Sequence, residues 1–63
     1  MHQTAQYESI VVTIREAAMI LGRSEPAVRH MVARGQIETV LLGSRRFIPR
    51  EAINAYLRSQ IVR

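Results

Sequence analysis

Near the middle of the chain a helix stop and a helix start stand almost side by side, and this juxtaposition constrains the fold more than any other feature. Thr13 offers an N-cap hydroxyl with Glu16 three residues later, which is the pattern of a capping box. Gly22 then supplies the left-handed conformation that commonly ends a helix. Between these signals the apolar residues fall on one helical face: Ile14, Ala17, Ala18 and Leu21. The sequence therefore predicts a first helix of about two turns.

A second helix start follows at once. Ser24 is an N-cap residue, Glu25 lies in the first turn, and Pro26 stands where a missing amide costs nothing. The apolar residues that cluster on one side of this helix are Val28, Met31 and Val32. Gly35 ends the pattern. Two short helices separated by two or three residues, with a glycine at the junction, have the spacing of a helix-turn-helix.

The rest of the chain predicts a hairpin and a third helix. Apolar residues lead to a Gly43-Ser44 turn and resume after it, which is the pattern of two short strands. Pro49 closes the second strand and can open a helix. The predicted buried side of that helix comprises Ile53, Tyr56, Leu57 and Ile61. An earlier apolar run, residues 10–12, can form another strand.

The predicted fold class is thus mainly α with a small β-hairpin: a winged helix-turn-helix made of a helix-turn-helix, a two-stranded wing and a C-terminal helix. Sixty-three residues leave room for one domain, which we place at residues 10–63. We expect the polar residues 1–9 to form a flexible N-terminal tail, in which His2 has no predicted role. Because the chain has no cysteine, disulfides, zinc knuckles and thiol catalysis are excluded.

Positive charge is concentrated in the middle of this domain. The chain carries nine basic residues, all of them arginine, against five acidic ones, for a net charge of +4. Six of the arginines and only two glutamates lie within residues 23–50. Arginine has a planar fork that fits phosphates and guanine edges, so this pattern favours a nucleic-acid partner, although codon bias in a GC-rich genome also explains the lack of lysine.

The second helix and the hairpin supply the candidate contacts, because one helix fits into the major groove of DNA and a hairpin tip can reach the minor groove or the backbone. The candidate DNA-binding residues are Arg23, Ser24, Glu25, Ala27, Arg29, His30, Arg34, Gly43, Ser44, Arg45 and Arg46. Residues adjacent in a strand point to opposite faces, so we expect only one of Arg45 and Arg46 to point at DNA from the strand.

Each candidate also has a purely structural interpretation. Glu25 can simply favour the helix dipole rather than accept from a cytosine amino group. Ser24 can cap the helix, hold a phosphate at the helix N-terminus near Arg23, or do both. The cationic residues of the second helix can form a solvated surface, and those of the hairpin can protect an edge strand from aggregation.

No feature predicts catalysis, a cofactor or a metal. The chain has no aspartate, no glycine-rich phosphate loop and no metal-ligand spacing. Tyr56 lies on the apolar side of the third helix, which favours a core role over that of a nucleophile. No stretch reaches the roughly 18 apolar residues of a membrane span, and no signal peptide is evident, so we expect a cytoplasmic protein of a bacterial host cell, located on DNA.

From Val12 to Leu57 the chain resembles the excisionase type of winged helix-turn-helix, related in shape to the MerR DNA-binding domain. The residues that carry the resemblance run through Thr13-Ile14-Arg15-Glu16-Ala17-Ala18, Leu21-Gly22-Arg23-Ser24, the segment 28–37, the segment 43–51 and Ala55-Tyr56-Leu57. The resemblance implies a recognition helix from Ser24 to Arg34 in the major groove and a wing at residues 43–46 in the adjacent minor groove. Arg29 and His30 match the family's aromatic or basic helix position, whereas Pro26 departs from its small polar residue. Because only a few residues follow the third helix in this sequence, we expect no dimerisation coil of the MerR type.

In function, the resemblance implies a phage excisionase, or recombination directionality factor, similar to those of mycobacteriophages. Such proteins do not catalyse a reaction themselves. Several copies bind direct repeats cooperatively and head to tail, bend the DNA and direct a phage integrase toward excision. Two alternatives stay open: a small winged-helix transcriptional regulator or phage repressor that binds inverted repeats, and a protein-interaction adaptor whose basic surface faces an acidic protein.

Overall fold

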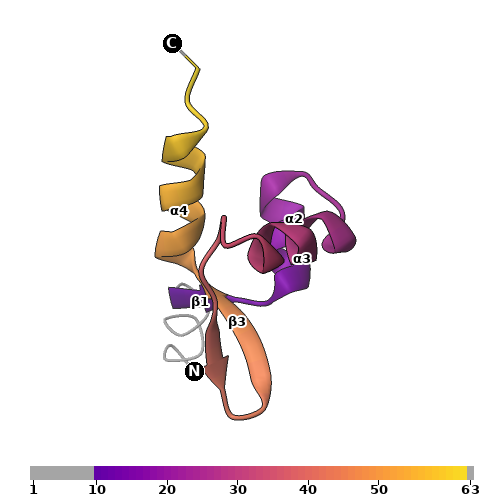
Figure 1. Cartoon of the computed structure of the whole chain (residues 1–63). Helices are drawn as coiled ribbons and strands as arrows, with labels where there is room; N and C mark the ends of the chain where they lie inside the picture. Colours follow the sequence, from indigo (N-terminus) through magenta and orange to yellow (C-terminus); the bar gives the residue numbers. More distant parts are fainter. Residues whose placement is uncertain (1–9, 63) are drawn as a thin grey trace.

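The computed structural model describes residues 10–62, which form three helices and three short strands (Figure 1). In chain order the elements are β1 (Val11–Val12), α2 (Ile14–Leu21), α3 (Glu25–Ala33), β2 (Val40–Leu42), β3 (Arg45–Pro49) and α4 (Arg50–Ser59). This order confirms the predicted winged helix-turn-helix. The predicted tail at residues 1–9, with His2, lies outside the described residues.

The ends of α2 are set by the two predicted signals. The Thr13 hydroxyl accepts from the Glu16 backbone N–H at 3.0 Å, and the Glu16 carboxylate accepts from the Thr13 N–H at 2.8 Å, so the capping box is complete. Gly22 ends the helix with a φ of +67°. In this left-handed conformation a residue with a Cβ is strained, which is why glycine stands here.

The turn into α3 is equally short. The Ser24 hydroxyl accepts from the Ala27 N–H at 3.2 Å and caps the helix as predicted. The helix ends at Ala33, with Arg34 as its C-cap and Gly35 following at a φ of +76°. Figure 1 shows α2 and α3 packed against each other beside the sheet, and only three residues separate them.

The strands form one antiparallel sheet in the order β1-β3-β2. Gly43 and Ser44 connect β2 to β3, and Leu42 pairs with Arg45 across the turn. In this turn Gly43 has a positive φ, +65°, and Ser44 does not. A positive φ at the first of the two turn residues alone is the pattern of a type II′ turn. Hence the predicted two-stranded wing is present, and β1 adds a third strand through the pairing of Val12 with Ile48. Ile10, included in the predicted apolar strand, lies outside β1 and is exposed.

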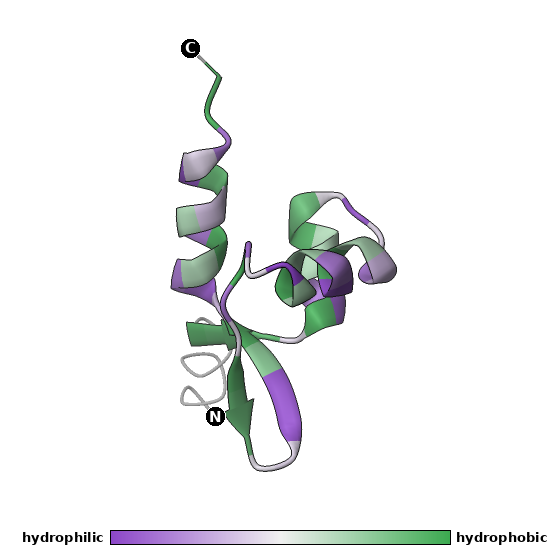
Figure 2. Cartoon of the chain, viewed as in Figure 1, coloured by the Kyte–Doolittle hydropathy of each residue, from purple (hydrophilic) through white to green (hydrophobic). Residues whose placement is uncertain are grey.

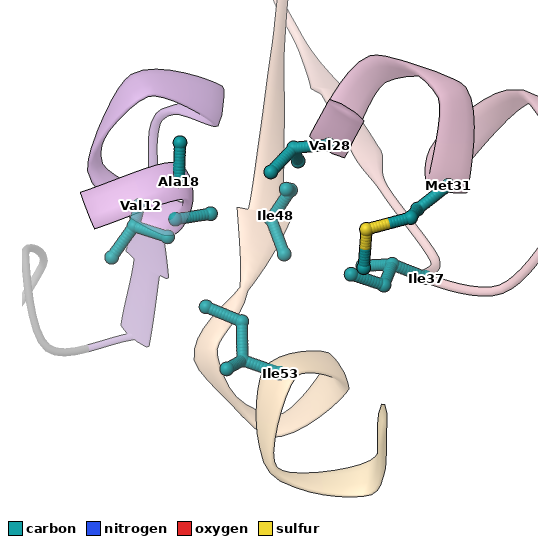
Figure 3. Packing of buried hydrophobic residues seen from close by; sticks show 8 residues of the cluster. Val12, Ala18, Val28, Met31, Ile37, Ile48 and Ile53 are labelled. Atoms are coloured by element: carbon teal, nitrogen blue, oxygen red, sulfur yellow. The ribbon is translucent and has the colours of Figure 1, made fainter. Parts of the chain in front are cut away.

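Helices and sheet share one small apolar core (Figure 3), which contains no buried polar or charged residue in the described part of the chain. Its members are Val12, Ala17, Ala18, Val28, Met31, Ile37, Ile48 and Ile53. Ile48 and Val28 are its largest fully buried side chains. Figure 3 shows Ile48 of β3 between residues of the other elements, so the central strand holds the helices together.

The last helix, α4, differs from the prediction. Pro49 is its N-cap and the last residue of β3, and Ile53 is its only fully buried residue. Tyr56 is half-buried and packs against the core, as predicted. Leu57, however, is 46% exposed and Ile61 is 57% exposed, so the prediction that both are buried is wrong. Figure 1 shows the reason: α4 projects beyond the other helices and strands, so none of these elements covers its far end.

Candidate nucleic-acid interface

The second helix of the helix-turn-helix turns one face to the core and the other to solvent. Val28 and Met31 are buried, whereas Arg29, His30 and Arg34 are exposed. The burial of Val28 and Met31 orients the helix, and the arginine and histidine side chains on its other side therefore face outward. This helix, α3, is thus the centre of the candidate interface.

A first hollow, of about 360 Å³, lies between α3 and the wing. The residues lining this wing-side hollow are Thr13, Ile14, Arg15, Glu25, Arg29, Arg45 and Arg46. A neighbouring hollow of about 400 Å³ shares Ile14, Arg29 and Arg46 with it. The structure therefore brings together four of the predicted contact residues, from α3 and from the wing.

Within the wing-side hollow, Glu25 is engaged by two arginines. Its carboxylate lies 3.7 Å from Arg15 Nε and accepts from Arg29 Nη2 at 3.4 Å. Arg29 comes from one turn further along α3, whereas Arg15 comes from α2. Glu25 therefore links the two helices of the helix-turn-helix and holds the side chain of Arg29. The sequence analysis did not single out Arg15, since its partner is brought near only by the packing of α2 against α3.

The two adjacent arginines at the start of β3 have different surroundings. Arg46 Nη1 donates to Thr39 Oγ1 at 2.9 Å, and Arg46 lines both the wing-side hollow and the hollow next to it. The Arg45 guanidinium lies 5.3 Å from the centroid of the Phe47 ring, a cation–π contact. In Figure 2 this basic start of β3 stands next to the apolar β2. That only one of the two arginines points at DNA stays a prediction.

A further hollow, of about 320 Å³, lies on the opposite flank of α3, toward α4. The residues lining this α4-side hollow are Arg23, Ala27, His30, Met31, Arg34, Gln36 and Tyr56. It gathers four more predicted residues, Arg23, Ala27, His30 and Arg34, and adds Tyr56, which the sequence analysis placed only in the core. Cationic side chains thus flank α3 on both sides.

The remaining predicted residues line none of these hollows. Ser24 is engaged as the cap of α3, and Gly43 and Ser44 form the tip of the wing. Among residues 10–62 no helix is long and apolar enough to cross a membrane. No three histidine, aspartate or glutamate side chains of the described chain gather as a metal ion would require.

Comparison with known proteins agrees with this geometry. A family model described as a helix-turn-helix domain matches residues 11–61, and the chain belongs to this family, a class of DNA-binding domain. A probable excisionase from Saccharopolyspora erythraea is 43% identical over 47 residues, which are 75% of this chain and 48% of that relative. The chain thus spans about half the length of that curated relative. No solved structure matches significantly. The resemblance to excisionases is confirmed, while the relation to MerR proteins stays a prediction.

Proposed function

We propose that the protein binds duplex DNA as an excisionase, with α3 in the major groove and the Gly43-Ser44 tip of the wing in the adjacent minor groove. The observation that carries this proposal is the pair of cation-lined hollows on the two flanks of α3. A major groove about 12 Å wide is nearly filled by one helix, so its two phosphate backbones pass along both flanks of that helix. The arginines on each flank of α3 then face a row of phosphates.

In this arrangement α3 itself reads the bases. Arg29 is 63% exposed at its side chain, and Glu25 holds it from within the same helix. A guanidinium held in this way can donate two hydrogen bonds to the O6 and N7 atoms of guanine. Around the helix, Arg23 and one of the two wing arginines, Arg45 or Arg46, contact phosphates and set the position of α3, since phosphate contacts orient a protein without reading sequence.

The proposed role in excision is architectural rather than catalytic. Several copies occupy neighbouring direct repeats, bend the DNA and allow a phage integrase to assemble for excision. The name of the relative as a probable excisionase supports this role, and so does the exposure of apolar side chains on different elements. Met19 of α2 is 76% exposed, and Val62 beyond α4 is 92% exposed. A contact between two unlike patches joins copies head to tail and does not close on itself, as direct repeats require.

The experiment that tests the proposal is selection of preferred sites from a pool of random duplexes by the purified protein. We expect clustered direct repeats spaced by about 10.5 base pairs, because copies one helical turn apart lie on the same side of the DNA. An inverted repeat would indicate a symmetric, dimeric regulator instead. No enrichment, together with no binding to random duplex at low salt, would refute DNA binding and favour an adaptor that binds an acidic protein.

Titrations of Arg29→Ala on the preferred site and on random duplex test the assignment of the reading helix. We expect this variant to bind the preferred site more weakly by about 1–3 kcal/mol, and random DNA only slightly less well. Equal losses on both would show that Arg29 contacts phosphate alone.

A further inference from the structure

The two flanks of α3 differ in their charge balance. In the wing-side hollow a carboxylate, Glu25, partly neutralises the arginines. No acidic residue lines the α4-side hollow, and neither Arg23 nor Arg34 forms an ion pair within residues 10–62. Since two guanidinium groups that share a hollow repel each other, this site favours an anion that is brought from outside.

A residue from outside the helix-turn-helix also lines the α4-side hollow. Tyr56 lines it from α4, and the ring of Tyr56 is half-buried against the core, which restricts its movement. Its side-chain hydroxyl makes no hydrogen bond with any described residue. A phenol that is anchored by its ring and whose O–H has no protein partner in this region can donate to a ligand.

We propose that the α4-side hollow binds one backbone phosphate of the duplex, with Arg23 and Arg34 pairing with its charge and the Tyr56 hydroxyl donating to one of its oxygens. This inference rests on the proposed function and extends the interface to α4, an element outside the helix-turn-helix and the wing. Tyr56 then acts as a phosphate contact as well as a packing residue, and α4 acts as a clamp on one strand.

The chemistry favours a phosphate over the other groups that DNA offers. A phosphodiester has acceptor oxygens only, and every polar group proposed here as a contact, two guanidinium groups and a phenol, can donate to it. A base edge carries both donors and acceptors, and its place is in front of α3 rather than at its flank. A free phosphate ion has the same chemistry as the backbone, so the test includes both sources.

The decisive variant is Tyr56→Phe, which keeps the ring in the core and removes only the hydroxyl. We expect binding about three- to tenfold weaker, on the preferred site and on random duplex alike, because a phosphate contact carries no sequence information. Unchanged melting temperature will show that the fold is intact. A loss confined to the preferred site would overturn the proposal, since it would indicate a base contact.

Arginine variants provide a second test with a matched control. Arg23→Gln should reduce the slope of log affinity against log salt by about 0.9, the value for one phosphate contact on B-DNA. Arg58→Gln removes the same charge from the exposed end of α4, outside the three hollows beside α3, and should leave this slope nearly unchanged. Equal effects of the two substitutions would mean that only net charge matters, and would overturn the site.

Duplexes in which single phosphates are replaced by neutral methylphosphonates identify the partner. At one position the replacement should weaken binding by the wild-type protein and abolish the difference in duplex affinity between it and Tyr56→Phe. If no position does so, the proposal fails. It also fails if Tyr56→Phe changes the binding of inorganic phosphate at constant ionic strength while leaving duplex affinity unaltered, because the ligand is then a free ion. In both cases the wild-type protein still binds duplex, so the proposed function stands; absence of any duplex binding would end both.

Discussion

Glu25 is the single carboxylate of the wing-side hollow, and two arginines from different helices share it. If α3 binds DNA as proposed, the position of Glu25 predicts two opposite effects on binding. A negative charge beside the groove repels phosphates, which lowers affinity for any duplex. The same charge orients Arg29, which improves discrimination between sequences because an ordered guanidinium loses less freedom on binding a guanine. We therefore predict that Glu25 reduces affinity for duplex DNA and increases specificity.

Replacing Glu25 by glutamine should separate these effects. We expect Glu25→Gln to bind random duplex about two- to fivefold more tightly, consistent with the up to about 1 kcal/mol that exposed charge pairs are worth. The ratio of preferred-site to random affinity should fall. Titrations on both duplexes at one salt concentration measure the two quantities.

Glu51→Gln is the control for this prediction, since Glu51 is also an exposed first-turn acid, on α4 rather than α3. It changes the net charge and the helix-dipole interaction in the same way, but not the surroundings of Arg29. If both substitutions raised random-duplex affinity equally, the pairing of Glu25 with Arg29 would have no special role.

The turn between α2 and α3 depends on the backbone of Gly22. Its φ is +67°, and a Cβ added there would meet nothing within 4 Å. A side chain at this position therefore costs only backbone strain. We expect Gly22→Ala to lower the free energy of unfolding by about 1–2 kcal/mol, and Gly22→Asn to lower it less, because asparagine tolerates the left-handed region. Urea unfolding of the three proteins tests this order, and equal stability of the alanine variant and the wild type would contradict it.

Local signals in the sequence predict the helices well and the sheet only in part. The caps at Thr13, Gly22 and Ser24 act within four residues of the chain, so the sequence alone indicates where α2 and α3 begin and where α2 ends. The pairing of Val12 with Ile48 joins segments 36 residues apart, and no local pattern specifies it. Periodicity also predicts burial of Leu57, but burial depends on whether a neighbouring element extends that far.

In the candidate site too, the sequence predicts the residues that local signals indicate and misses those that tertiary packing brings there. Charge and helix position were sufficient to nominate the arginines of α3 and of the wing. The sequence did not predict Arg15 and Tyr56 as part of the candidate site, because their place beside α3 arises from the packing of α2 and α4 around it. The predicted cap by Ser24 is confirmed, while a phosphate contact at the same helix N-terminus stays a prediction.

The described chain as a whole rests on one core of eight buried side chains. In so small a domain each large member carries much of the total stability, since there is little other apolar burial to compensate. Ile48 is fully buried in the central strand, whereas Leu57 is 46% exposed on α4. The two residues offer a matched comparison of aliphatic side chains with the same number of atoms.

We expect Ile48→Ala to lower the free energy of unfolding by about 2–5 kcal/mol, which is enough to unfold much of the protein. Leu57→Ala should lower it by less than about 1 kcal/mol, because its side chain loses little contact. Thermal or urea unfolding monitored by circular dichroism measures both changes. Similar losses in the two variants would show that α4 packs more closely than described.

The attachment of α4 has a consequence for its amide protons. The helix is held by one fully buried residue, Ile53, and its N-cap Pro49 makes no side-chain hydrogen bond to it. Backbone hydrogens in an element with so few buried contacts exchange with solvent through local opening, and we expect those of α3, where Val28 and Met31 are buried, to be better protected. We expect the last turn of α4 to exchange fastest among the helices. If a phosphate bridges Tyr56 to α3, added duplex will slow that exchange, so deuterium uptake by this one turn reports occupancy of the clamp.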